Sequence, residues 1–325
     1  MSITRRSFFR YCTLSAGALG LCHSKLGLLR EALANPAAPS VIWLIGSACT
    51  GCSVSFLNRI AEKPGDPASV VGVDDVVANA INLVFHPTIM GAAGETSVAA
   101  LKRATAGGNF VLVLEGAVAT KFQGQPCVMW SYHGQEVTFQ QAVSELVPKA
   151  LATVCVGTCA SFGGIPASGS NPTGAMGVKQ FTGRSTINIS GCPANPDWVV
   201  WAIVQLLTST PVTLDADGRP SDLYTKGFTG ATEEPIIHDK CPRNPGNTGT
   251  LLANDYGENG HCLEMLGCRG PFTKSRCNGQ WNGIGGRGPG QAHPGHWCIG
   301  VNAPCHGCVE KTFPGPQPFY TPYVP

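Results

Sequence analysis

The sequence predicts an α/β domain followed by a smaller, loop-rich domain that is organised by metal. In the first two thirds of the chain, short apolar runs alternate with segments of helical spacing. The last 90 residues contain sixteen glycines and eleven prolines, a composition that by itself is typical of disorder. The same residues include seven of the fifteen cysteines, and metal–ligand bonds can supply the folding free energy that such a segment lacks.

Five runs in the first part are apolar on both faces, as buried parallel strands are. They span residues 41–45, 81–85, 110–114, 152–156 and 186–189. Helical segments separate them, and the helix after the fifth run begins with an N-cap asparagine and a first-turn proline, Asn195 and Pro196. This alternation predicts a doubly wound, flavodoxin-like parallel sheet over roughly residues 40–208.

The first 34 residues combine the features of an export signal. Arg5 and Arg6 precede an apolar stretch at residues 11–21, which is too short to cross a bilayer. Ala32-Leu33-Ala34 then provides a cleavage site. We therefore expect a twin-arginine signal peptide at residues 1–34 and a periplasmic protein.

The chain after this signal divides into an α/β domain (residues 35–208), a connection (209–235) and the second domain (236–325). Its 17 basic and 19 acidic residues give a net charge of −2 without a basic run, which excludes a nucleic-acid-binding protein. The last residues, 318–325, cannot span a bilayer. We expect any membrane association to come through a partner.

Four cysteines of the first domain follow predicted strands at their carboxyl ends. Cys49 and Cys52 follow the first strand, Cys159 the fourth and Cys192 the fifth. Because the carboxyl ends of parallel strands meet at one edge of a sheet, we expect these thiols to converge there. A lone C-x-x-C would suggest a redox dithiol or half of a zinc site, whereas four converging cysteines favour a 4Fe–4S cluster.

The second domain supplies the remaining ligand candidates. They are Cys241, Cys262, Cys268, Cys277, Cys298, Cys305 and Cys308. Together with the first four, these cysteines are one ligand short of three four-ligand clusters, and an imidazole can fill such a place. The His-x-x-Cys spacing to Cys241 favours His238, with His261 and His306 as competitors. Spacing alone does not say which thiolates share a cluster.

Three other residues lie outside these ligand sets. Glu115 ends the third strand and should face the same edge of the sheet. Its carboxylate has two competing interpretations: a structural one, as a helix cap or ion-pair partner, and a functional one, as a proton relay or a support for the cluster. Cys155 lies inside a strand and Cys127 has no partner at ligand spacing, so both are expected to be small buried hydrophobes.

An exported chain rich in cysteine is usually a disulfide scaffold, because the periplasm is oxidising. The twin-arginine route carries folded proteins, so clusters inserted beforehand would protect their thiolates. Thirteen cysteines remain after the signal, and this odd number, with the tight C-x-x-C pairs, disfavours a metal-free disulfide protein.

Eight motifs occur in order along the chain. They are Cys49-Thr50-Gly51-Cys52, Phe85-His86-Pro87-Thr88, Glu115-Gly116, Val156-Gly157-Thr158-Cys159, Gly191-Cys192-Pro193, His238-x-x-Cys241, Cys262-Leu263-x-x-Leu266-Gly267-Cys268 and Cys305-x-x-Cys308-Val309-Glu310. With these motifs the chain resembles the small, iron–sulfur subunit of periplasmic nickel-iron hydrogenases over nearly its whole length.

The resemblance implies how the ligands are shared. The proximal set would be Cys49, Cys52, Cys159 and Cys192, the distal set His238, Cys241, Cys262 and Cys268, and the medial set Cys277, Cys298, Cys305 and Cys308. Many members have proline where this chain has Cys298, and their medial cluster is of the 3Fe–4S type. A fourth thiolate should complete a 4Fe–4S cluster and lower its potential, a pattern that resembles the nickel-iron-selenium subgroup.

The resemblance also implies a function. Dihydrogen would react at a nickel-iron or nickel-iron-selenium centre in a separate large subunit, so that no residue of this chain is catalytic. This chain would relay electrons through three 4Fe–4S clusters to a multihaem cytochrome c. The principal alternative is an electron-transfer subunit of a non-hydrogenase complex, such as a quinone-reducing oxidoreductase, which would share the α/β domain but lack the cysteine-rich second domain.

Overall fold

The computed structural model describes residues 39–63, 66–79, 81–225, 236–277 and 297–324. The expected signal and its cleavage site lie outside these residues, as do residues 226–235 of the expected connection. Among the described residues, no helix has the length and apolar character needed to cross a bilayer.

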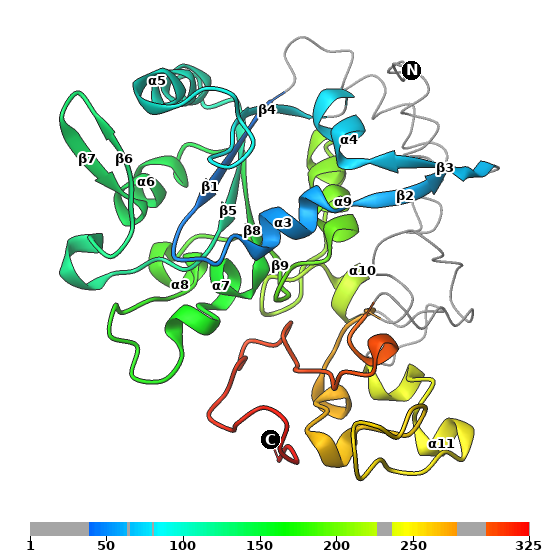
Figure 1. The fold of residues 1–325 in the computed structure, drawn as a ribbon. Helices are drawn as coiled ribbons and strands as arrows, with labels where there is room; N and C mark the ends of the chain where they lie inside the picture. The colour runs from blue at the N-terminus through cyan, green and yellow to red at the C-terminus, as the bar shows by residue number, and fades with distance from the viewer. Residues whose placement is uncertain (1–38, 64–65, 80, 226–235, 278–296, 325) are drawn as a thin grey trace.

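A parallel sheet of five strands forms the centre of the first domain (Figure 1). Its strands are β1 (Ser40–Ile45), β4 (Asn82–Phe85), β5 (Phe110–Glu115), β8 (Ala152–Val156) and β9 (Ile187–Ile189). They lie in the order β4-β1-β5-β8-β9, the flavodoxin-like order in which the first strand lies between the second and third parallel strands. The predicted strands are confirmed, each within one residue of its expected bounds.

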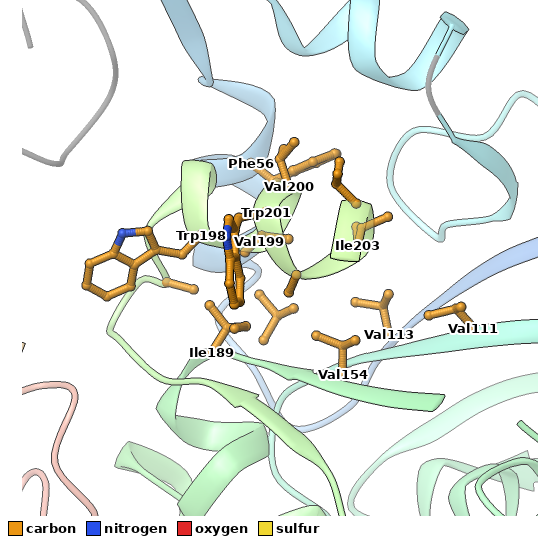
Figure 2. Packing of buried hydrophobic residues seen from close by; sticks show 14 of the residues in the cluster. Phe56, Val111, Val113, Val154, Ile189, Trp198, Val199, Val200, Trp201 and Ile203 are labelled. Atoms are coloured by element: carbon orange, nitrogen blue, oxygen red, sulfur yellow. The ribbon is translucent and has the colours of Figure 1, made fainter. Parts of the chain in front are cut away.

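Helices cover both faces of this sheet, because alternate side chains of each strand point to opposite faces. The helices α3 (Gly51–Leu57), α4 (Val73–Asn79) and α9 (Pro196–Leu207) cover one face. On the other face lie α5 (Gly94–Thr105), α6 (Phe139–Leu146), α7 (Gly157–Phe162) and α8 (Val178–Thr182). Figure 2 shows α9 on the first face, with Trp198 and Ile203 above Val154 and Ile189.

The helix α9 is apolar almost all round, and ten of its twelve residues are buried. Asn195 caps it as predicted, because its side-chain oxygen accepts a hydrogen bond from the backbone N–H of Asp197 at 3.0 Å. Part of the expected connection also belongs to this core: α10 (Ser221–Tyr224) buries Tyr224, whose ring lies 5.2 Å from that of Trp198.

Two antiparallel hairpins were not predicted. They are formed by β2 (Ile60–Lys63) with β3 (Asp66–Gly72) and by β6 (Val128–Tyr132) with β7 (Gln135–Thr138). In the second hairpin, His133 and Gly134 both have positive φ, as a two-residue hairpin turn requires. A histidine is a weaker turn signal than asparagine or aspartate at the first of these positions, which is why the pattern was missed.

The second domain is loop-rich, as predicted. Its described elements are η3 (His238–Lys240), α11 (Pro245–Thr248), η4 (Glu264–Leu266), η5 (Gly270–Phe272) and η6 (Ile299–Val301), each of three or four residues. Its small core includes Ile237, Leu263, Trp297 and Ile299, together with three cysteines: Cys241, Cys268 and Cys305. Ligand candidates therefore occupy core positions here.

Candidate metal centres

The proximal set lies at the carboxyl edge of the sheet. Cys49 lies between β1 and α3, and Cys52 lies in the first turn of α3. Cys159 lies in α7 after β8, and Cys192 follows β9. Burial, together with the nearby Cys192 and Cys49, raises the pKa of the Cys159 thiol to about 11. The four thiols are thus close enough to repel one another as thiolates, which is the condition a cationic metal centre relieves.

Two glycines leave space for the Sγ atoms of the proximal cysteines. Gly157 begins α7 with φ +86°, and a Cβ atom there would lie 2.5 Å from the Sγ atom of Cys52. Gly164 has φ +52°, and a Cβ atom there would lie 3.1 Å from the Sγ atom of Cys159. A side chain at either position would strain the backbone and fill space beside a ligand candidate.

Glu115 is buried beneath the proximal set, with 1% of its surface exposed. Its carboxylate accepts hydrogen bonds from the backbone N–H groups of Cys52 at 3.0 Å and Ser53 at 3.2 Å, and from the Trp43 indole at 3.2 Å. The Ser53 hydroxyl donates to it as well, and His86 Nε2 lies 3.3 Å from that hydroxyl. These are the contacts of a helix cap that also fixes the backbone of a ligand candidate.

The distal set surrounds η3 and η4. A ring nitrogen of His238, the Sγ atom of Cys262 and a carboxylate oxygen of Glu264 lie within 4.8 Å of one another. Burial, together with the neighbouring Cys241 and Cys262, raises the pKa of the Cys268 thiol to about 11. Glu264 had no place in the sequence interpretation, and its position two residues after Cys262 is the signal that could have found it.

The two competing histidines have other surroundings. His261 Nδ1 lies 3.1 Å from a carboxylate oxygen of Glu258. The His306 ring packs against Phe319 and Tyr320, with centroid distances of 4.7 Å and 5.2 Å. Among the residues described, His238 is therefore the histidine that lies with the distal thiols.

The medial set lines one cavity of about 470 Å³. Its walls include Cys277, Cys298, Cys305 and Cys308, and also Cys192 of the proximal set. Burial, together with Cys305 and Cys298, raises the pKa of the Cys277 thiol to about 12. Cys298 thus shares its cavity with the other three medial cysteines. All thirteen cysteines that the structure describes are free thiols, and their three soft donor sets suit iron–sulfur ligation.

Contacts join neighbouring sets. Cys192 of the proximal set lines the medial cavity, and the hydroxyl of Thr158, next to Cys159, donates to the carbonyl oxygen of Cys308, which links the medial set to the proximal set. The backbone N–H of Cys305 donates to the Sγ atom of Cys268 at 3.3 Å, which links the medial set to the distal set. The three sets therefore lie in a row, with the medial set in the centre.

Cys155 and Cys127 belong to none of these sets. Cys155 is fully buried among the apolar residues beneath α6 and α7, and burial raises the pKa of its thiol to about 12. Cys127 is partly buried and packs against the same core. Both contacts are those of small apolar side chains.

Comparison with known proteins places these sets in a family. Residues 49–206 match the family described as NADH ubiquinone oxidoreductase, 20 Kd subunit, and residues 234–320 match the C-terminal family of NiFe/NiFeSe hydrogenase small subunits. The chain is 35% identical to the periplasmic [NiFeSe] hydrogenase small subunit of Desulfomicrobium baculatum, over 98% of this chain and 99% of that one. The chain belongs to the hydrogenase small-subunit family.

Other hydrogenase small subunits are similar to the same extent. The periplasmic [NiFe] small subunit of Solidesulfovibrio fructosivorans is 34% identical, over 96% of this chain and 90% of that one. A solved [NiFeSe] hydrogenase from Desulfovibrio vulgaris Hildenborough has a TM-score of 0.73 at 33% identity, covering 87% of this chain and 97% of its own. The match to the second domain separates this small subunit from the non-hydrogenase alternative, which shares only the first.

Proposed function

We propose that this chain relays electrons between a hydrogen-oxidising centre in a separate large subunit and an external acceptor. The observation that carries the proposal is the row of three four-ligand sets: Cys192 of the proximal set lines the medial cavity, and the backbone N–H of the medial Cys305 donates to the Sγ atom of the distal Cys268. A row of redox sites with short gaps is what a protein needs to move electrons through its interior. Each set would hold one 4Fe–4S cluster, and the clusters would supply the one-electron chemistry.

The medial set supports the proposal of three 4Fe–4S clusters. Cys298 lines the same cavity as the other three medial cysteines, so a fourth thiolate is within reach of a cluster there. A 4Fe–4S cluster at this position would have a lower potential than a 3Fe–4S cluster, because cluster type and charge set the potential.

The two ends of the row would face different partners. Cys49 and Cys192 are exposed, so the proximal end is open to a large subunit that carries the nickel-iron or nickel-iron-selenium centre. At the other end, His238 is partly buried and Glu264 is exposed, which leaves the distal set near the surface. There we propose electron exchange with a multihaem cytochrome c in the periplasm, after export by the twin-arginine route.

For Glu115 we propose a supporting role in place of the proton relay. Its carboxylate already accepts bonds from two backbone N–H groups, an indole and a hydroxyl. A carboxylate with this many donors is held as an acceptor and keeps the Cys52 backbone in place. On this proposal no residue of this chain is catalytic.

Hydrogen-dependent dye reduction by the co-purified complex tests the proposed function. Wild-type complex should reduce a one-electron dye under hydrogen, and Cys52→Ser should abolish this activity because the proximal cluster is lost. Cys127→Ser is the matched control, since Cys127 is outside all three sets. Full activity of the Cys52 variant, or a wild-type complex without activity under hydrogen, would contradict the proposal.

A further inference from the structure

Three arginines of the described residues are almost fully buried, and Arg269 is compensated differently from the other two. Arg59 forms an ion pair with Asp197 at 2.9 Å. Arg219 is 3% exposed and forms ion pairs with Asp215 at 2.9 Å and Glu310 at 3.3 Å. Arg269 is 4% exposed, and no carboxylate of the described residues forms an ion pair with it. Its guanidinium donates instead to the backbone oxygens of Pro314 and Gln317.

Arg269 lies where the medial and distal sets meet. It directly follows Cys268, a distal ligand candidate, and its backbone N–H donates to the carbonyl oxygen of Cys305, a medial ligand candidate, at 2.7 Å. The rings of Phe319 and Tyr323 cover the guanidinium, with centroids 4.7 Å and 4.5 Å from its central carbon. The charge is thus held in place by the chain's C-terminal segment.

A buried charge without a counter-ion is costly, by several kcal/mol in proteins. Carbonyl oxygens and aromatic faces offset part of this cost, and arginine stays protonated even so. Burial lowers the pKa of Arg269, whereas the nearby Tyr323 and Cys305 raise it. A thiolate-ligated iron–sulfur cluster carries net negative charge, so clusters on either side would supply the missing counter-ion.

We propose that Arg269 is the counter-ion of the medial and distal clusters and raises their reduction potentials. This inference rests on the proposed function, because it requires clusters in both sets. A fixed positive charge favours the reduced, more negative form of a cluster, so the potential rises. It would offset the lowering that the fourth medial thiolate, Cys298, brings. Arg269 is a positioning and tuning residue in this scheme and contributes no cluster ligand.

A redox titration of the intact complex, followed by electron paramagnetic resonance, tests this role. Arg269→Gln removes the charge and should lower the ratio of reduced to oxidised medial cluster roughly tenfold at a given potential, which is about 59 mV for a one-electron couple. Arg269→Lys keeps the charge and should leave the potentials near the wild-type values. Lys149→Gln is the control: it removes one positive charge that is exposed at the surface beside Glu145, and should leave the potentials unchanged.

Gln317→Glu provides a second route if the Arg269→Gln complex does not assemble. The backbone oxygen of Gln317 accepts from the guanidinium at 3.0 Å, while its side-chain amide bonds the backbone of Val324, so a carboxylate in place of this amide adds a negative charge near the arginine without removing it. Gln317→Glu should therefore lower the reduction potentials of the medial and distal clusters, as Arg269→Gln does. Unchanged potentials in a charge-removing variant with full iron content would overturn the inference, as would a shift in Arg269→Lys equal to that in Arg269→Gln. Absence of clusters from the wild-type complex would instead overturn the proposed function.

Discussion

The two domains of this chain are stabilised by different means. The α/β domain buries aliphatic and aromatic side chains on both faces of a five-stranded sheet. The second domain has elements of three or four residues, and three of the eight residues in its core are ligand candidates: Cys241, Cys268 and Cys305. Apolar burial can fold the first domain, whereas the second needs metal–ligand bonds in addition.

The boundary between the domains sharpens this difference. The hydroxyl of Ser190, just after β9, donates to the carbonyl oxygen of Val309 at 2.8 Å, and Arg219 reaches Glu310. Cys277 and Cys308 also pack against the core of the first domain. The sheet domain thus anchors the medial set, whereas the described partners of the distal Cys241, Cys262 and Cys268 thiols lie in the second domain.

The largest expected effect comes from removing the metal. Chelation of iron under reducing conditions should expose the backbone of residues 236–277 to solvent, while the strands of the sheet keep their protection. Amide hydrogen exchange, measured peptide by peptide by mass spectrometry, compares the two domains in one sample. Equal loss of protection in both domains, or none in the second, would break the distinction between them.

A smaller effect is expected when a single ligand candidate of the second domain is replaced, because only the medial cluster should change. Cys298→Ala should convert the medial cluster to a 3Fe–4S type, with about one iron atom fewer per chain and a higher potential. Cys155→Ala is the matched change in the first domain, where the thiol only fills space, and should cost stability without altering iron content. An unchanged cluster in the Cys298 variant would remove this residue from the medial set.

The pH dependence of the first domain provides a further test. Burial lowers the pKa of His86 to about 4, against 6.5 for an ordinary histidine, so the unfolded chain binds this proton more readily. Stability is therefore fully present above pH 6.5 and falls as the pH drops toward 4, by up to roughly 3 kcal/mol. His86→Gln should flatten this dependence in denaturant titrations. A variant that keeps the wild-type slope would show that another group is responsible.

The smallest expected effects are those of helix caps in the first domain. Asn195→Ala and Thr138→Ala each remove a side-chain oxygen that accepts a backbone hydrogen bond at a helix start. Each should lower the free energy of unfolding by about 1 kcal/mol. Iron content should stay at the wild-type value, and a loss of iron in either variant would mean that the sheet domain and the clusters are coupled more tightly than the two-domain contrast allows.

The sequence predicted the parts that depend on local pattern. The five parallel strands are apolar on both faces, and the Asn195-Pro196 pair marks the start of α9, so both could be read without the structure. The hairpin at His133 and Gly134 could not, because its turn uses an uncommon residue. The burial of Tyr224 also escaped prediction, since it depends on contact with Trp198 and not on its neighbours in sequence.

The candidate site divides in the same way. Strand order brings Cys49, Cys159 and Cys192 to one edge, and this convergence followed from the predicted topology. In the second domain, the spacing of the cysteines in the sequence did not show which of them share a set. Irregular loops, unlike parallel strands, do not bring their ends to one predictable edge. The uncompensated charge of Arg269 and the position of Glu264 became visible only once distant segments were placed side by side.

The most direct test of the account is the iron content of the oxidised complex, measured together with its electron paramagnetic resonance spectrum. Beyond the iron of the large subunit's centre, three four-ligand sets predict about twelve iron atoms from this chain and no signal from a 3Fe–4S cluster. About eleven iron atoms from this chain with such a signal would contradict the medial set, and about eight or fewer would contradict the row of three clusters.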